Sequence, residues 1–334
     1  MNFPLFSRFL FLTLILLEFH NITHAQPLSR SQFEEQILEI STMILFDADR
    51  QATGLKKSNC PAGVKEFLYV YELELSPTKM QNKNLAINCQ DWQKVTQYIY
   101  ELNVIYKSTQ LKKVSLVLAE TLDNALFDHV TKALLVPKTF SIEAQTKFSS
   151  DVLTIMGHEF GHFLLVQFIP GFNPANVSVE ESFYLVAASE VLADLFVVLK
   201  SQDPKIIYKA LQFTKSFQKK PAFKASAIAR DFSERSNELE KVESRLKNQS
   251  KLSINTFLNM PHNFFSPIRY HLWKYYFSRT LSSDQKRNLA IQTGKVFLKV
   301  IKRNMRNISE NSMTNFSSFN RAVVKELDLS LTKL

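Results

Sequence analysis

The strongest constraint on this chain is an apolar segment, residues 152–169, that encloses the sequence His158-Glu159-Phe160-Gly161-His162. Apolar residues occupy nearly every position of the segment, which predicts a helix buried on all sides. Residues four apart share a helix face, so His158 and His162 are expected to present two imidazoles to one point. Burying these imidazoles together with Glu159 costs free energy unless they have partners. The segment therefore requires a compensating group in the core.

The spacing of these polar residues matches H-E-x-x-H, in which two histidines bind zinc and the glutamate takes a proton from zinc-bound water. We predict one Zn²⁺ per chain, with His158 and His162 as ligands and Glu159 as the general base. The same segment contains Gly157 and Gly161, each of which costs about 1 kcal/mol relative to Ala in a helix interior. Close approach of another backbone or of a ligand would explain them. The alternative is a structural His/Glu network without metal.

A second apolar stretch, residues 183–199, carries only two charged residues, Glu190 and Asp194. Carboxylates four apart on a helix repel each other, and burial increases that cost, so they require a cation or hydrogen-bond donors. A zinc ion bound by His158, His162 and Glu190 satisfies both helices. Asp194 is then expected to accept a hydrogen bond from a ligand imidazole and so to orient it.

This arrangement resembles the gluzincin type of zinc metallopeptidase, in which a glutamate on the following helix is the third ligand and an aspartate four residues on supports a histidine. The Glu-x-x-Ala-Asp form, residues 190–194, is similar to the CAAX-prenyl-protease-like branch. The run from Asn124 to His162 also resembles a group of uncharacterised secreted bacterial metallopeptidases. The resemblance covers about residues 120–200.

Some positions depart from these patterns. Leu165 and Phe168 exclude the metzincin extension, which needs Gly and His there. The 28-residue step from His162 to Glu190 is longer than in thermolysin-like enzymes. Glu181 lies nearer to that shorter spacing, but no Asp follows it four residues on. We therefore expect Glu190, and not Glu181, to be the ligand.

The resemblance implies further parts of a catalytic site. An oxyanion formed during hydrolysis needs a donor, and a loose match to the late His-Pro…Arg segment of the prenyl-protease-like branch makes His262 and Arg269 candidates. The alternative for these two residues is a loop and a solvated helix start. By the same resemblance, a strand at residues 133–137 would hold an extended peptide substrate at the sheet edge. A plain core strand is the competing interpretation.

The first 25 residues read as a signal peptide, with a basic residue, an apolar core at residues 9–17, and small residues before a cut after Ala25. Nine apolar residues are too few to span a bilayer, which takes about 20, although an uncleaved anchor is the alternative. We expect a secreted or periplasmic protein without a transmembrane segment in its mature chain. The cysteines at 60 and 89 would then favour a disulfide over two free thiols.

Periodicity predicts strands before the central helix and helices after it. The expected strands are 67–75, 114–118 and a hairpin or bent strand within 123–137; residues 50–65 are expected to be a loop. The expected helices are 32–45, 91–105, the two apolar segments, and stretches near 206–217, 223–250, 266–280 and 284–305. This order predicts an α+β, zincin-like fold with a small mixed sheet, an edge strand before the H-E-x-x-H helix, and a mainly helical C-terminal half. We divide the mature chain into a metallopeptidase core, 26–202, and a helical subdomain, 203–334.

Charge is uneven along the 334 residues, because residues 203–334 hold 25 Lys and Arg against 10 Asp and Glu. Such a half can make peripheral contact with an anionic surface, but the dispersed charges favour ordinary solvated helix faces, and nucleic acid is not an expected partner. The sequence predicts an exported zinc metalloendopeptidase that hydrolyses peptide or protein substrates. The alternatives are a non-catalytic, zinc-stabilised envelope binding protein and an H-E-x-x-H hydrolase of a non-peptide substrate.

Overall fold

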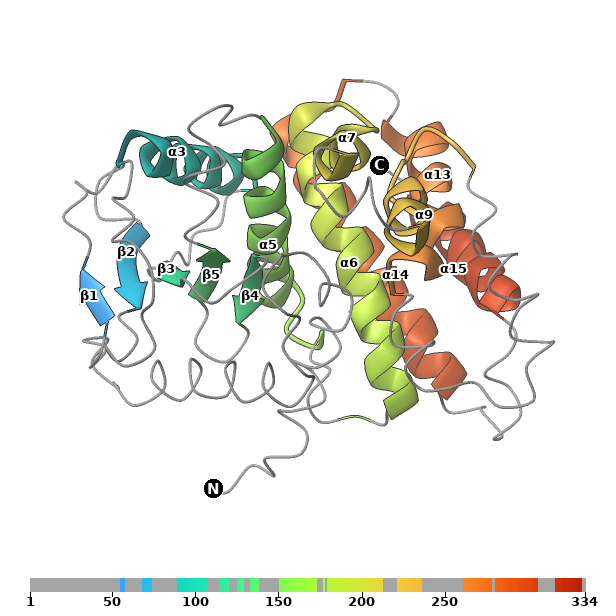
Figure 1. Cartoon of the computed structure of the whole chain (residues 1–334). Coiled ribbons are helices and arrows are strands. Elements are labelled where there is room, and N and C mark those ends of the chain that lie inside the picture. Colours follow the sequence, from blue (N-terminus) through green and yellow to red (C-terminus); the bar gives the residue numbers. More distant parts are fainter. Residues whose placement is uncertain are drawn as a thin grey trace.

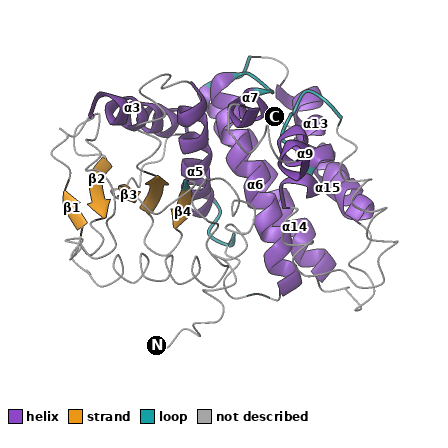
Figure 2. Cartoon of the chain, in the orientation of Figure 1, coloured by secondary structure: helices purple, strands orange, loops and turns teal. Residues whose placement is uncertain are grey.

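The described residues form one sheet beside a larger group of helices (Figures 1 and 2). The predicted signal peptide, the predicted helix at 32–45 and Cys60 lie outside the residues that the computed structural model describes, so the predictions on them stay predictions. The described residues are 55–57, 68–73, 89–106, 114–119, 125–128, 133–137, 150–172, 177, 179–212, 221–235, 261–277, 280–305 and 316–331.

The described sheet has five strands in the order β1-β2-β3-β5-β4. The three central strands are parallel to one another, and both outer strands run antiparallel to their neighbours. Helix α3, Cys89–Tyr106, is part of the connection that a parallel β2–β3 pair needs. A mixed sheet followed by helices agrees with the α+β prediction. The strands are β1 (Leu55–Lys57), β2 (Leu68–Leu73), β3 (Val114–Ala119), β4 (Leu126–Asp128) and β5 (Ala133–Pro137).

The prediction that residues 133–137 form the sheet edge is wrong. These residues form β5, which pairs with β3 on one side and with β4 on the other. The hairpin itself is confirmed, since Phe127 lies opposite Leu134 in an antiparallel register. The hairpin folds β4 back along the outside of β5, so β4 is the edge strand. The expected loop at residues 50–65 also contains a short strand, β1.

Helices α5 (Ser150–Phe168) and α6 (Val179–Ser201) confirm the two predicted apolar helices and pack against each other. Figure 1 shows α5 between the sheet and α6. The two helices cross closely at Gly161. A Cβ atom added there would lie 2.8 Å from the Cα of Ala193 and 2.9 Å from its carbonyl oxygen. Backbone approach thus accounts for the glycine.

The C-terminal half is mainly helical where it is described. The expected helix over 223–250 is confirmed for 223–229, but the expectation is wrong for 230–235, because α9 ends at Ala229. The backbone beyond it is held otherwise: Phe232 N donates to Pro204 O at 3.0 Å, and Asp231 Oδ1 accepts from Ser233 N at 2.8 Å. The described elements are α7 (Ile206–Gln212), α9 (Pro221–Ala229), α12 (Pro261–Phe264), α13 (Ser266–Leu272), the π-helical turn η3 (Trp273–Phe277), α14 (Ser283–Met305) and α15 (Phe316–Leu331).

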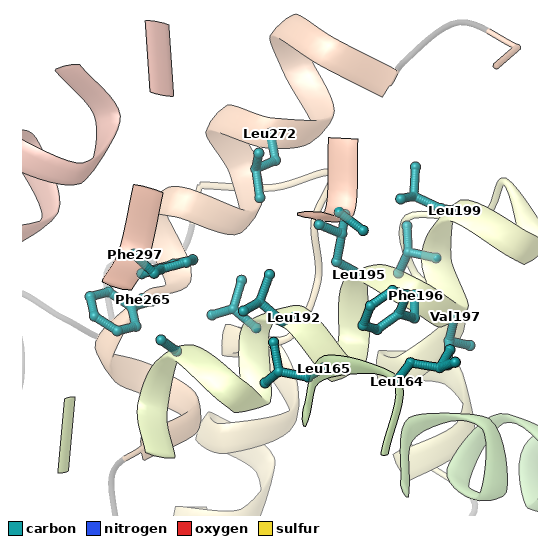
Figure 3. Close-up of a cluster of buried hydrophobic side chains, with 14 of the residues drawn as sticks. Leu164, Leu165, Leu192, Leu195, Phe196, Val197, Leu199, Phe265, Leu272 and Phe297 are labelled. Atoms are coloured by element: carbon teal, nitrogen blue, oxygen red, sulfur yellow. The ribbon is translucent and has the colours of Figure 1, made fainter. Parts of the chain in front are cut away.

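The core is centred on α6, which contacts α5, α12 and α14. Figure 3 shows leucine and phenylalanine side chains from α5, α6, the α12–α13 region and α14 meeting in this core. From the sheet side, Tyr106 of α3 donates its hydroxyl to Phe196 O at 2.7 Å and packs edge-on against that phenylalanine ring. No helix within the described ranges combines the length and the apolar content needed to cross a membrane.

Substituting Gly161→Ala tests whether the helix crossing limits the fold. Alanine gains about 1 kcal/mol of helix propensity, but overpacking a core costs about 1–3 kcal/mol. Because the added methyl group meets backbone rather than a flexible side chain, we expect a net loss of about 1 kcal/mol in the free energy of unfolding, measured by urea denaturation. The control is Gly171→Ala, whose Cβ meets the ends of two side chains, those of Leu298 and Lys302, and not backbone. A more stable Gly161→Ala protein would contradict this account.

Candidate metal centre

Three side chains converge between α5 and α6. The Nε2 atoms of His158 and His162 are 3.2 Å apart, Glu190 Oε2 is 3.1 Å from His158 Nε2, and Glu190 Oε1 is 3.5 Å from His162 Nε2. In a tetrahedral site with zinc–ligand bonds of about 2.0–2.1 Å, neighbouring ligand atoms are about 3.3 Å apart. Each imidazole thus lies at about this separation from one of the two Glu190 oxygens, and one donor atom from each residue brings all three within 4.8 Å of one another. These residues are buried and form a group that can hold a metal ion.

The chemistry of the donors also fits a cation. Burial lowers the pKa of His162 to about 3, so its imidazole is neutral and has a lone pair to offer. Among the described residues, Glu190 Oε2 accepts no hydrogen bond of good geometry, although it is buried. A buried carboxylate oxygen in this condition is costly. Two imidazole nitrogens and a carboxylate form a donor set that zinc accepts. Glu181 is not in this group.

Asp194 lies one helical turn beyond Glu190 and is fully buried. Its Oδ1 is 2.9 Å from His158 Nδ1, as expected for a carboxylate that orients a ligand imidazole. Burial raises the pKa of Asp194, but Arg230 and Arg269 outweigh this effect and hold that pKa well below its usual range. The carboxylate is therefore ionised. On the other imidazole, Ser189 Oγ lies 3.3 Å from His162 Nδ1.

Glu159 is buried beside the candidate metal ligands and is tied to the sheet. Its Oε2 accepts a hydrogen bond from Phe127 N at 3.0 Å, so the edge strand β4 fixes one carboxylate oxygen. Burial raises the pKa of Glu159 to about 7, with a smaller contribution from Glu190. A carboxylate with a pKa near neutrality is suited to both accepting and returning a proton.

The candidates from the C-terminal half reach the same place. His262 of α12 places Nδ1 at 3.1 Å from Glu190 Oε2. Arg269 of α13 is fully buried; it donates to Asp194 Oδ2 at 2.8 Å through Nη2 and to His262 O at 2.6 Å through Nη1. All seven residues that the sequence indicated thus lie in one cluster, although Arg269 faces Asp194 and the chain rather than a substrate position.

Sequence reasoning missed Arg230, which lies directly after α9. Its Nε donates to both oxygens of Asp194 at 3.1 Å, and its Nη2 donates to Oδ1. The residue falls within the stretch 223–250 that the sequence predicts to be helical. The available signal was an arginine directly after the apolar residues 227–229, together with an Asp194 that required a cation. The backbone amide of Phe127 carried no such signal.

We predict that the protein binds one divalent metal ion and that Glu190 is essential for it. The full-length protein, loaded with zinc and freed of excess metal, should contain about one zinc per chain. Replacing Glu190 by Gln removes a direct ligand, so it should weaken binding by more than the about 10–100-fold typical of outer hydrogen-bond partners. Competition with a chromophoric chelator measures both the zinc content per chain and the zinc dissociation constant. Glu181→Gln is the matched control; a loss there, with Glu190→Gln unaffected, would reverse the assignment.

Comparisons with known proteins supply no relative for this chain. Searches of protein-family models, curated proteins and solved structures returned no match. The gluzincin resemblance is therefore carried by the residues of this sequence alone. The donor set and the groups that surround it are the features that indicate a function.

Proposed function

We propose that this chain is an exported zinc metallopeptidase with a zincin-like active site, which hydrolyses peptide bonds in peptide or protein substrates. One observation carries the proposal: a buried Glu159, whose carboxylate is held by the N–H of Phe127, lies beside the candidate metal-binding group of His158, His162 and Glu190. A structural zinc site needs no such base. Export is inferred from the N-terminal sequence alone.

When bound, zinc acidifies water and polarises a carbonyl group. The residues of this chain do the rest. Glu159 accepts the proton from the attacking water and returns it to the leaving amine. The Phe127 amide keeps one Glu159 oxygen fixed, so the carboxylate holds its orientation during both transfers. His158, His162 and Glu190 would hold the ion as three protein ligands, and sites with three protein ligands are typical of catalytic rather than structural zinc.

Two further roles follow from the positions of the remaining residues. His262 adjoins Glu190, and we assign it as the donor to the developing oxyanion. Arg269 is fully buried between Asp194 and the His262 carbonyl, so we assign it a positioning role in place of contact with substrate.

The substrate is proposed to add to the sheet at β4, which replaces the earlier assignment to residues 133–137. Extended peptides commonly bind to proteins by adding a strand at the edge of a sheet. Because Phe127 of β4 contacts Glu159 directly, a peptide aligned on β4 would bring its scissile bond next to the general base.

Replacing Glu159 by Gln should separate metal binding from hydrolysis. Glutamine keeps the size of the side chain but cannot accept the proton, so peptide hydrolysis should fall by about 100-fold or more. Zinc content should stay at the wild-type value, because Glu159 is not a ligand. Both are measured on full-length protein, with a fluorogenic peptide library and metal analysis.

Glu181→Gln provides the control for this experiment and should leave both quantities unchanged. Hydrolysis that persists in Glu159→Gln would remove this residue from the mechanism. A zinc-loaded wild type that cleaves no peptide, but hydrolyses esters or only binds envelope polymers, would favour one of the two alternative functions.

A further inference from the structure

Arg230 is a buried cation that the proposed reaction does not use. It follows α9 and lies 36 positions from Asp194 in the sequence, yet its guanidinium contacts both Asp194 and the ring of His158. An arginine is rarely buried without a partner, and desolvating a guanidinium is costly. Its position next to a metal ligand therefore calls for an explanation.

The two arginines divide the Asp194 carboxylate between them. Arg269 Nη2 and Nε both donate to Oδ2, at 2.8 and 3.1 Å. Arg230 Nη2 donates to Oδ1, and its Nε bridges both oxygens. Oδ1 is also the oxygen that lies 2.9 Å from His158 Nδ1. Arg230 thus holds the oxygen that faces the metal ligand, whereas Arg269 holds the far one.

The backbone around Arg230 is anchored on both sides. Arg230 N donates to Ala227 O at 3.1 Å, which closes the last turn of α9. Phe232 is fully buried and donates its backbone N–H to Pro204 O. Asp231 accepts hydrogen bonds from both the backbone and the hydroxyl of Ser233. These contacts fix the backbone from which the Arg230 side chain extends, and a group that positions another residue needs such a fixed backbone.

We propose that Arg230 is a positioning residue of the metal centre: it fixes Asp194 Oδ1 so that His158 donates its Nδ1–H there and directs Nε2 to the metal. This inference rests on the proposed metal centre but not on any particular substrate. The ring must carry its proton on Nδ1 for Nε2 to bind a metal. A correctly placed Oδ1 selects that form and fixes the plane of the ring.

The opposite role has a geometric basis and a distinct consequence. Arg230 Nη2 is also 2.9 Å from His158 Nδ1 and 3.4 Å from His158 Nε2. A guanidinium only donates hydrogen bonds. If it donated to Nδ1, the ring proton would lie on Nε2 and block the metal. Removing Arg230 would then tighten metal binding. Removal would also tighten binding if Arg230 acted only as a positive charge that repels the metal ion. The proposal predicts weaker binding, so the sign of the change decides between these roles.

The experiment measures zinc dissociation constants of the full-length protein by chelator competition. For Arg230→Gln we expect binding weaker by about 10-fold, the range typical of partners that orient a metal ligand. The exposed Arg235→Gln, from the same segment, should bind zinc like the wild type. Unchanged or tighter binding in Arg230→Gln overturns the proposal. Zinc binding does not depend on turnover, so a protein that holds zinc but cleaves no peptide would contradict the proposed function and leave this test intact.

A double-mutant cycle with Asp194→Asn tests the route of the effect. If Arg230 acts through Asp194, the double variant should bind zinc no more than about 3-fold more weakly than Asp194→Asn alone. If the double variant weakened zinc binding by the full product of the two single-variant factors, the proposal would be overturned. A wild type that binds no zinc would overturn both this inference and the proposed function.

Arg230→Lys covers the case in which Arg230→Gln does not fold. Lysine keeps the charge but lacks the rigid planar fork with which Arg230 donates through Nε and Nη2 at once. We expect the Lys variant to keep the melting temperature of the metal-free protein near that of the wild type, and yet to bind zinc more weakly and to shift the visible spectrum of the Co²⁺-loaded protein. A wild-type spectrum and a wild-type dissociation constant in Arg230→Lys would show that only charge matters and would overturn the proposal.

Discussion

The structure depends on the close crossing of α5 and α6, where Gly161 meets the backbone of Ala193. Both helices are apolar over nearly their whole surface, so the crossing removes them from water together. Any polar side chain on the facing surfaces must then find its partner inside the protein. The four polar residues that face one another there, His158, His162, Glu190 and Asp194, do so through mutual contacts.

The crossing helices do not by themselves balance this cluster. Glu159, Glu190 and Asp194 are all buried between them, and isolated buried carboxylates are costly. The compensating guanidiniums come from the C-terminal half, on Arg230 and Arg269. That half therefore completes the candidate site rather than merely covering it. A bound divalent cation would supply the remaining positive charge next to Glu190.

The sheet contributes through its edge. Because the hairpin folds β4 outside β5, the N–H of Phe127 is turned toward Glu159 instead of toward a further strand. This one short element of three residues therefore ties Glu159 to the sheet.

The sequence by itself determined the two apolar helices and the five residues 158, 159, 162, 190 and 194, because helical spacing places residues on a face through local geometry. It also indicated the hairpin, since strand and turn signals are local. Only the tertiary structure decided that β4 rather than β5 is the edge, that α9 stops at Ala229, and that Arg230 joins Arg269 at Asp194. These features depend on contacts between segments tens of residues apart. Periodicity carries no information about such contacts, since they arise only when the helices and the sheet pack together.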